Sequence, residues 1–186
     1  ILVVRIAAGE FQAKEFGARS EQEDVTKVDL TQRPFRVKTD GRDVETHALI
    51  IATGVTARRL GVPTEETLWS RGMSACAVCD GALPIFRNKE LLVIGGGDSA
   101  VEEATFLTKF ASKVYIVHRR DELRASKIMQ QRALDNPKIE VLWDTVLVDA
   151  EGDTVVTGAR VKNVKTEEER SVPCSGIFYA LGHDPN

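Results

Sequence analysis

One short segment constrains the fold of this chain more than any other. The apolar run Leu91–Ile94 leads directly into a glycine-rich turn, Gly95–Ala100, with the letters GGGDSA. The apolar run predicts a buried strand, and small and apolar residues then recur at helical spacing over Ser99–Phe110. A second apolar run, Lys113–Val117, follows. We therefore expect a parallel strand–helix–strand unit and an α/β fold, because parallel strands need a crossover connection.

The remaining patterns add strands on both sides of this unit. Three runs near the N-terminus have the composition of strands: Val25–Leu30, Phe35–Thr39 and Ala48–Ala52. The last is apolar throughout, which is typical of a strand buried on both faces, and Asp40-Gly41 predicts the turn before it. Downstream we expect a helix, a strand and then a small meander: Ser126–Leu134, Ile139–Trp143, Val155–Lys162, Glu169–Pro173 and Gly176–Leu181.

The glycine turn indicates a nucleotide site. Gly95 allows the tight turn, Gly97 lets a pyrophosphate approach the backbone, and a small residue at Ala100 lets the helix pack closely on the strand. The helix beginning at Asp98 and Ser99 would supply free N–H groups to the phosphates. A G-x-G-x-x-A pattern alone is also compatible with a tight turn that binds nothing, so its place between a strand and a helix matters.

The end of the second strand indicates which nucleotide. Units that bind NAD usually place an acidic residue there, but this chain has His118, Arg119 and Arg120, with Arg124 one turn further on. Arginine can hold a 2′-phosphate through charge-assisted hydrogen bonds, so we predict NADPH. The alternative is a solvated basic corner, or ion pairs with Glu122.

The cysteines indicate redox chemistry. Cys76 and Cys79 form a C-x-x-C, a spacing that favours a lowered thiol pKa and rapid exchange. Asp80 follows directly and could transfer the proton that exchange requires. The pair could also be half of a zinc site or two unrelated thiols, but no suitably spaced ligands complete a zinc site, so we expect no metal. Cys174 stands alone, and we take it as structural.

Composition excludes other classes of protein. The 186 residues suffice for one domain, or for one domain and part of another. Lys and Arg number 25 against 28 Asp and Glu, a net charge of −3, which argues against a general nucleic-acid binder. No apolar stretch approaches the roughly 20 residues of a membrane span. The chain begins with Ile1, so we expect it to be an excerpt from a longer one.

A flavin is expected from the chemistry. Hydride does not pass readily from a nicotinamide to a disulfide, and flavin is the usual relay between them. The sequence contains one glycine fingerprint, whereas a flavin dinucleotide would normally require a second.

Several motifs together resemble one family. The motifs are IIATG (Ile50–Gly54), SACAVCDG (Ser74–Gly81), GGGDSA, HRRDELRAS (His118–Ser126) and GHDPN (Gly182–Asn186). In order and in combination they are similar to the low-molecular-weight NADPH-dependent thioredoxin reductases, over about Phe16 to Asn186, with plant, algal or fungal members most similar. We recognise no such resemblance in Ile1–Glu10.

The resemblance implies a flavoprotein with two dinucleotide-binding domains. Residues 1–61 would be part of an FAD-binding domain, residues 62–180 a Rossmann-like NADPH-binding domain with the C-x-x-C, and residues 181–186 the return to the FAD-binding domain. Thr53, Gly54 and Gly182 would be the flavin-side turns. The family's first FAD fingerprint would precede the chain and its last flavin motif would follow it.

The resemblance also implies a mechanism and partners. Cys79 would face FAD, Cys76 would attack the disulfide of thioredoxin, and Asp80 would act as acid and base. We expect a homodimer located inside the cell, in the cytoplasm, or in a plastid or mitochondrion if a transit peptide precedes Ile1, and we expect the 186-residue fragment alone to be inactive. The alternatives are the flavoprotein of a peroxide-reducing system and a nonenzymatic NADP(H)-binding sensor.

Overall fold

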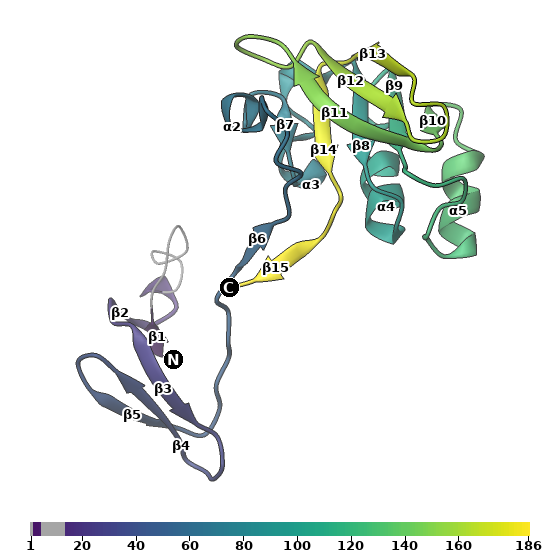
Figure 1. Ribbon diagram of the computed structural model, residues 1–186. Helices are drawn as coiled ribbons and strands as arrows, with labels where there is room; N and C mark the ends of the chain where they lie inside the picture. Colours follow the sequence, from purple (N-terminus) through teal and green to yellow (C-terminus); the bar gives the residue numbers. More distant parts are fainter. Residues whose placement is uncertain (1, 5–13) are drawn as a thin grey trace. The chain divides into compact units, whose positions relative to one another are not determined.

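The computed structural model describes residues 2–4 and 14–186, and the chain divides into two compact units (Figure 1). The first unit is Ile1–Thr53 and the second is Gly54–Asn186. Most of the segment Ile1–Glu10 lies outside the described residues. No helix in the described part of the chain is long and apolar enough to cross a bilayer.

The first unit contains two small sheets. Strand β1 (Leu2–Val4) pairs in parallel with β2 (Arg19–Glu21). Strands β3 (Val25–Asp29), β4 (Phe35–Thr39) and β5 (Asp43–Thr46) form an antiparallel sheet, which confirms the first two predicted strands. The turn at Asp40-Gly41 leads into β5, which the sequence did not predict.

The predicted strand Ala48–Ala52 is wrong. This segment has no regular structure, and the side chains of Ile50 and Ile51 are 89% and 72% exposed. An apolar run becomes a buried strand only where neighbouring strands satisfy its backbone groups. Within the described residues no strand pairs with it.

The second unit is built on a five-stranded parallel sheet in the order β10-β9-β8-β14-β7. The expected unit around the glycine turn is confirmed: β8 and β9 are parallel and are connected by helix α4. The elements are β7 (Met73–Ser74), β8 (Glu90–Ile94), α4 (Asp98–Leu107), β9 (Lys113–Val117), α5 (Lys127–Leu134), β10 (Ile139–Leu142) and β14 (Gly176–Tyr179).

Both faces of this sheet are covered (Figure 1). Leu91 and Val93 of β8 pack with α4 residues such as Leu107 in one core cluster. Leu92 and Ile94, which alternate with them, pack in a second cluster against an antiparallel sheet. That sheet consists of β11 (Thr145–Glu151), β12 (Gly158–Asn163) and β13 (Glu169–Pro173).

The predicted meander was assigned the wrong set of strands. Its last member, β14, lies instead between β8 and β7 in the parallel sheet. Its true first strand is β11, whose polar ends Thr145 and Glu151 weaken the apolar pattern. A strand that is buried throughout fits the centre of a parallel sheet, and all four residues of β14 are buried.

Two extended segments form an antiparallel ribbon within the second unit. Strand β6 (Val55–Ala57) pairs with β15 (His183–Pro185). Next along the chain, helix α2 (Glu65–Leu68) begins with a carboxylate that is only 3% exposed. The oxygens of Glu65 accept the backbone N–H groups of Leu60 and Gly61 at 3.1 Å each, so both oxygens of this buried side chain are hydrogen-bonded.

Candidate functional site

The glycine turn lies where β8 ends and is too tightly packed for side chains at its first two positions. Gly95 has φ +155°, and a Cβ there would lie 2.7 Å from the carbonyl oxygen of Ala180. A Cβ on Gly96 would lie 2.2 Å from Nδ1 of His118. Only glycine can occupy these positions without displacing the backbone or the imidazole. Ala100 is fully buried beside Gly95, as expected of the third position of the fingerprint.

Above the turn there is room for a ligand. A Cβ on Gly97 would meet nothing within 4 Å. Gly97 is also the N-cap of α4, and no side chain caps this helix end. The N–H groups of its first turn, including that of Ser99, are therefore available to an anion. These observations fit the pyrophosphate of a dinucleotide.

The three predicted arginines follow β9, and the backbone of one of them, Arg124, is hydrogen-bonded to Gly96 of the glycine turn. Among the described residues, no hydrogen bond or ion pair joins the guanidinium of Arg119, Arg120 or Arg124 to another group. All three side chains are exposed. The carboxylate of Glu122 pairs with Lys127 at 2.6 Å instead, which argues against the alternative that the arginines pair with Glu122.

The two acidic residues near these arginines, Asp121 and Glu122, have lysine partners. A hydrogen bond from Lys127 lowers the pKa of Glu122, and one from Lys165 lowers the pKa of Asp121. Because both carboxylates form ion pairs with lysines, they do not pair with the arginines, whose side chains are exposed. Such a cluster fits a 2′-phosphate.

His118 supports the turn. Its imidazole is 5% exposed, packs against Gly96, and places Nε2 3.0 Å from the carbonyl oxygen of Glu122. Burial lowers its pKa, so the ring is neutral near pH 7. His118 therefore connects the glycine turn to the basic segment, which favours a supporting role over direct contact with the nucleotide.

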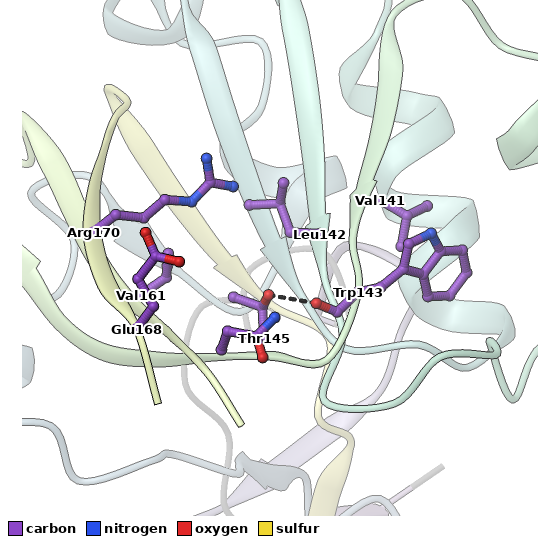
Figure 2. Close-up of a pocket in the computed structure, with 8 residues that line it drawn as sticks. Val141, Leu142, Trp143, Thr145, Val161, Glu168 and Arg170 are labelled. Atoms are coloured by element: carbon purple, nitrogen blue, oxygen red, sulfur yellow. Dashed lines mark hydrogen bonds between the residues drawn. The ribbon is translucent and has the colours of Figure 1, made fainter. Parts of the chain in front are cut away.

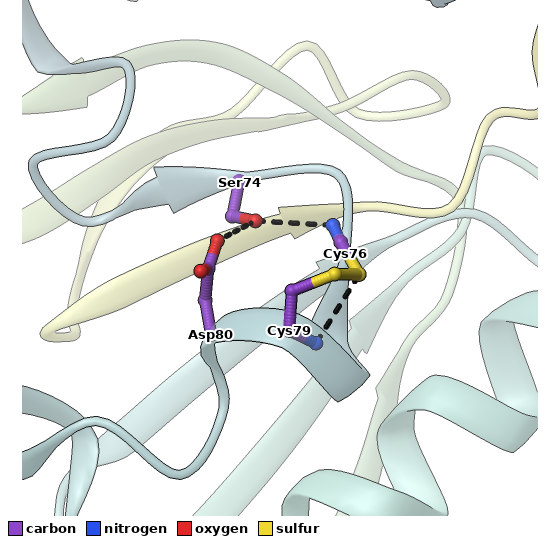
Figure 3. The surroundings of a disulfide bond; sticks show 4 residues. All are labelled: Ser74, Cys76, Cys79 and Asp80. Carbon is purple, nitrogen blue, oxygen red and sulfur yellow. Dashed lines mark hydrogen bonds between the residues drawn. A yellow bond between two sulfur atoms is a disulfide. The ribbon is translucent and has the colours of Figure 1, made fainter. Parts of the chain in front are cut away.

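Cys76 and Cys79 form a disulfide, with their Cα atoms 5.3 Å apart (Figure 3). The two unrelated thiols considered from the sequence are therefore not what the structure shows. Helix α3 (Ala77–Asp80) begins between the two cysteines, and Sγ of Cys76 accepts the N–H of Cys79 at 3.2 Å. Cys79 is exposed and Cys76 is half-buried, so the pair is accessible to another molecule.

Ser74 contacts the predicted acid–base residue and was not selected as a site residue from the sequence. Its hydroxyl donates to Oδ2 of Asp80 at 2.5 Å and accepts the N–H of Cys76 at 3.0 Å (Figure 3). The hydroxyl therefore connects the predicted acid–base residue to the disulfide loop. A serine two residues before a C-x-x-C was the available signal, but its burial and its partners depend on the fold.

The third cysteine, Cys174, is buried and is not part of the disulfide. Cys174 is 5% exposed within the core, and burial raises the pKa of its thiol to about 12. Among the described residues, no group of three or more His, Cys, Asp or Glu side chains could hold a metal ion.

The predicted flavin-side turns lie at the ends of the β6–β15 ribbon. Gly54 and Gly182 have φ +79° and +91°, and a Cβ on either would meet no atom closer than 3.6 Å. Both turns therefore leave space for a ligand. The ribbon does not bring them together: Gly54 precedes β6 and Gly182 precedes the antiparallel partner β15, so they lie about 13 Å apart along the strands. Thr53 ends the first unit.

A cavity of about 340 Å³ lies elsewhere in the second unit (Figure 2). It is at the end of β10, beneath β12 and β13, where the hydroxyl of Thr145 donates to the carbonyl oxygen of Trp143 at 2.6 Å. None of the predicted site residues lines it. Its lining is Val141, Leu142, Trp143, Thr145, Val161, Asn163, Glu168 and Arg170.

This chain is similar to known proteins along almost its whole length. Residues 7–186 match the family described as pyridine nucleotide-disulphide oxidoreductase. Thioredoxin reductase 2 of Arabidopsis thaliana is 55% identical over 94% of this chain and 47% of its own length. Thioredoxin reductase 1 of Saccharomyces cerevisiae is also 55% identical, over 94% of this chain and 56% of its own.

Solved structures agree. The thioredoxin reductase of Giardia duodenalis superposes with a TM-score of 0.82 at 43% identity, covering 95% of this chain and 58% of that one. That of Lactococcus lactis gives a TM-score of 0.76, also at 43% identity, covering 97% and 61%.

The chain belongs to the pyridine nucleotide-disulphide oxidoreductase family. Within that family, the resemblance to plant and fungal thioredoxin reductases is confirmed by these relatives. The chain spans about half the length of the curated relatives it matches.

Proposed function

We propose that this chain serves the NADPH-dependent reduction of the thioredoxin disulfide, with FAD and NADPH as cofactors. The observation that carries the proposal is the accessible Cys76–Cys79 disulfide in the same unit as a glycine turn and exposed arginines that pair with no other described residue. The names of the relatives support thioredoxin as the substrate.

In this proposal, NADPH binds across the end of the parallel sheet. The N–H groups around Gly97 and Ser99 hold the pyrophosphate, and Arg119, Arg120 and Arg124 hold the 2′-phosphate. FAD, when bound near Thr53, Gly54 and Gly182, would supply the electron relay between the hydride donor NADPH and the disulfide.

The reduced pair then acts by thiol–disulfide exchange. Reduction of Cys76–Cys79 takes up two electrons and two protons and gives two thiols. Asp80 accepts the proton of the Cys76 thiol, and the resulting thiolate attacks the partner disulfide and forms a mixed disulfide. The leaving partner thiolate takes that proton back from Asp80. Cys79 then loses its proton and attacks Cys76, which restores the intramolecular disulfide, and the second partner sulfur leaves and takes up the Cys79 proton.

The broader organisation is proposed from the resemblance. We assign residues 1–61 and 181–186 to an FAD-binding domain and residues 62–180 to the NADPH-binding domain. Because the nicotinamide and Cys79 must both reach the flavin, the two domains must change orientation between half-reactions. A homodimer and a location inside the cell complete the proposal.

Replacement of Cys79 tests the function. In flavin-loaded protein that carries this chain, Cys79→Ser should abolish reduction of thioredoxin while NADPH still bleaches the flavin absorbance. A variant with normal thioredoxin turnover would reject the disulfide's role. If peroxide reduction through another acceptor protein proceeds and thioredoxin reduction does not, the peroxide-reducing alternative is favoured. If the full-length protein shows no flavin absorbance as purified, the sensor is favoured.

A further inference from the structure

The segment Leu123–Ser126, which carries Arg124, alternates between buried and exposed side chains. The side chains of Leu123 and Ala125 are 4% and 5% exposed and belong to the core beneath α4. Arg124 between them points to solvent. The backbone on each side of this arginine is therefore anchored while its guanidinium stays available.

A glutamine in the next helix is hydrogen-bonded to both of these buried residues. The side-chain amide of Gln130, in α5, donates to the carbonyl oxygen of Leu123 and to that of Ala125, at 2.9 Å each. A single amide group thus bonds the residues immediately before and after Arg124. The following glutamine, Gln131, makes no such contact and donates to Asp135 instead.

The glycine turn and α4 hold the same segment from the other side. The carbonyl oxygen of Gly96 accepts the N–H groups of Arg124 and Ala125, at 2.7 and 3.0 Å. Oδ1 of Asp98 accepts the N–H and the hydroxyl of Ser126, at 2.7 and 3.0 Å. Asp98, whose backbone N–H is predicted to face the phosphates, therefore also holds the arginine segment through one oxygen of its carboxylate.

We infer that Gln130 and Asp98 are positioning residues that set the preference for a 2′-phosphorylated nucleotide by fixing the backbone around Arg124. The inference rests on the proposed function, because it needs NADPH as the ligand. Bidentate recognition of a phosphate depends on the direction of the guanidinium, so an unfixed backbone would have to be ordered on binding. The preference then lies partly in residues that do not touch the phosphate.

Two small ligands separate this effect from general damage. 2′,5′-ADP carries the 2′-phosphate and 5′-AMP lacks it, and calorimetric titration measures the affinity of the chain for each without any turnover. Gln130→Ala should weaken 2′,5′-ADP about tenfold and 5′-AMP less than about twofold. Gln130→Met, of similar shape but without a donor, should behave like the alanine variant, and Gln131→Ala should behave like the wild type.

A double-mutant cycle tests the route of the effect. If Gln130 acts through Arg124, the Arg124→Ala and Gln130→Ala changes together should weaken 2′,5′-ADP no more than Arg124→Ala alone. Asp98→Ala should also lower the preference, and Asp98→Asn, which keeps an acceptor oxygen, should restore most of it.

The possible failures are distinguishable. A wild type that binds both ligands equally contradicts the proposed NADPH site itself. A wild type that prefers 2′,5′-ADP, with Gln130→Ala and Gln130→Met that keep the full preference, overturns the positioning role alone. Equal weakening of both ligands in these variants also overturns it, because a purely structural brace would act on both.

Discussion

The hydroxyl of Ser74 lies 2.5 Å from Oδ2 of Asp80, and the same hydroxyl accepts the N–H of Cys76. Ser74 ends strand β7, whereas Asp80 ends the short helix that contains Cys79. One hydroxyl group thus connects the Asp80 carboxyl to the backbone of Cys76.

Removal of this hydroxyl should affect stability and exchange together. Ser74→Ala leaves the N–H of Cys76 without its partner in a part-buried site, so the free energy of unfolding of the oxidised protein should fall by about 1–3 kcal/mol. Urea denaturation measures this change. Exchange of the reduced pair with a small disulfide should also slow, because Asp80 loses its orienting donor. Ser112→Ala, an exposed serine outside the site, is the control; equal effects in both variants would contradict the assignment.

The arginines should discriminate between nicotinamide cofactors. Replacing Arg119 and Arg120 by Ala should weaken NADPH at least about tenfold and NADH about twofold or less, because only NADPH carries the 2′-phosphate. Quenching of intrinsic tryptophan fluorescence by each cofactor measures the affinities. Arg132→Ala, an exposed arginine on α5, should leave both unchanged. Equal losses for the two cofactors would remove the 2′-phosphate assignment.

The cysteines should differ sharply in reactivity. At pH 8 a thiol with a pKa of about 12 is ionised to only about one part in ten thousand, and Cys174 is buried as well. After mild reduction of the native protein, iodoacetamide should therefore label Cys76 and Cys79, while Cys174 reacts only after denaturation. Peptide mass spectrometry assigns the sites. Rapid native labelling of Cys174 would show that the core around it opens.

Glu103 should make stability depend on pH. Burial, and secondarily Glu102, raises its pKa from 4.5 to about 7, and its Oε2 has no hydrogen-bond partner among the described residues. Between pH 4.5 and 7 the folded state keeps a proton that the unfolded state has lost, so this group's contribution weakens as pH rises through that range. Since the side chain is partly exposed, the loss should be about 1–2 kcal/mol.

A neutral variant isolates this contribution. Glu103→Gln cannot ionise, so its stability relative to the wild type should rise from pH 5 to pH 8 in urea denaturation. Glu102→Gln, at the exposed neighbouring position, should reproduce little of this change. A constant difference between Glu103→Gln and wild type across the range would show that Glu103 ionises normally.

The sequence predicted those parts of the fold that depend on local pattern. The strand, turn and helix around Gly95 follow from residues adjacent in the chain, and the structure confirms them. The position of β14 does not follow, because strand order depends on pairing between distant segments. The Ala48–Ala52 prediction failed for a related reason, since apolar character does not specify a partner strand.

The same distinction applies to the site. Cys76 and Cys79 were recognisable by their spacing, and Arg119 by its position after a strand. Ser74 and Gln130 were not, because each acts through hydrogen bonds made only when separate elements meet. The burial of His118 against Gly96 was missed for the same reason.

The transfer of electrons from NADPH to the sulfur pair can be measured directly. FAD-loaded protein that carries this chain is incubated anaerobically with NADPH, quenched with N-ethylmaleimide and analysed by mass spectrometry, with NADH in a parallel sample. The account predicts that the peptide holding Cys76 and Cys79 gains two maleimide groups with NADPH and few with NADH at the same concentration. A pair that stays oxidised while NADPH reduces the bound flavin would contradict it.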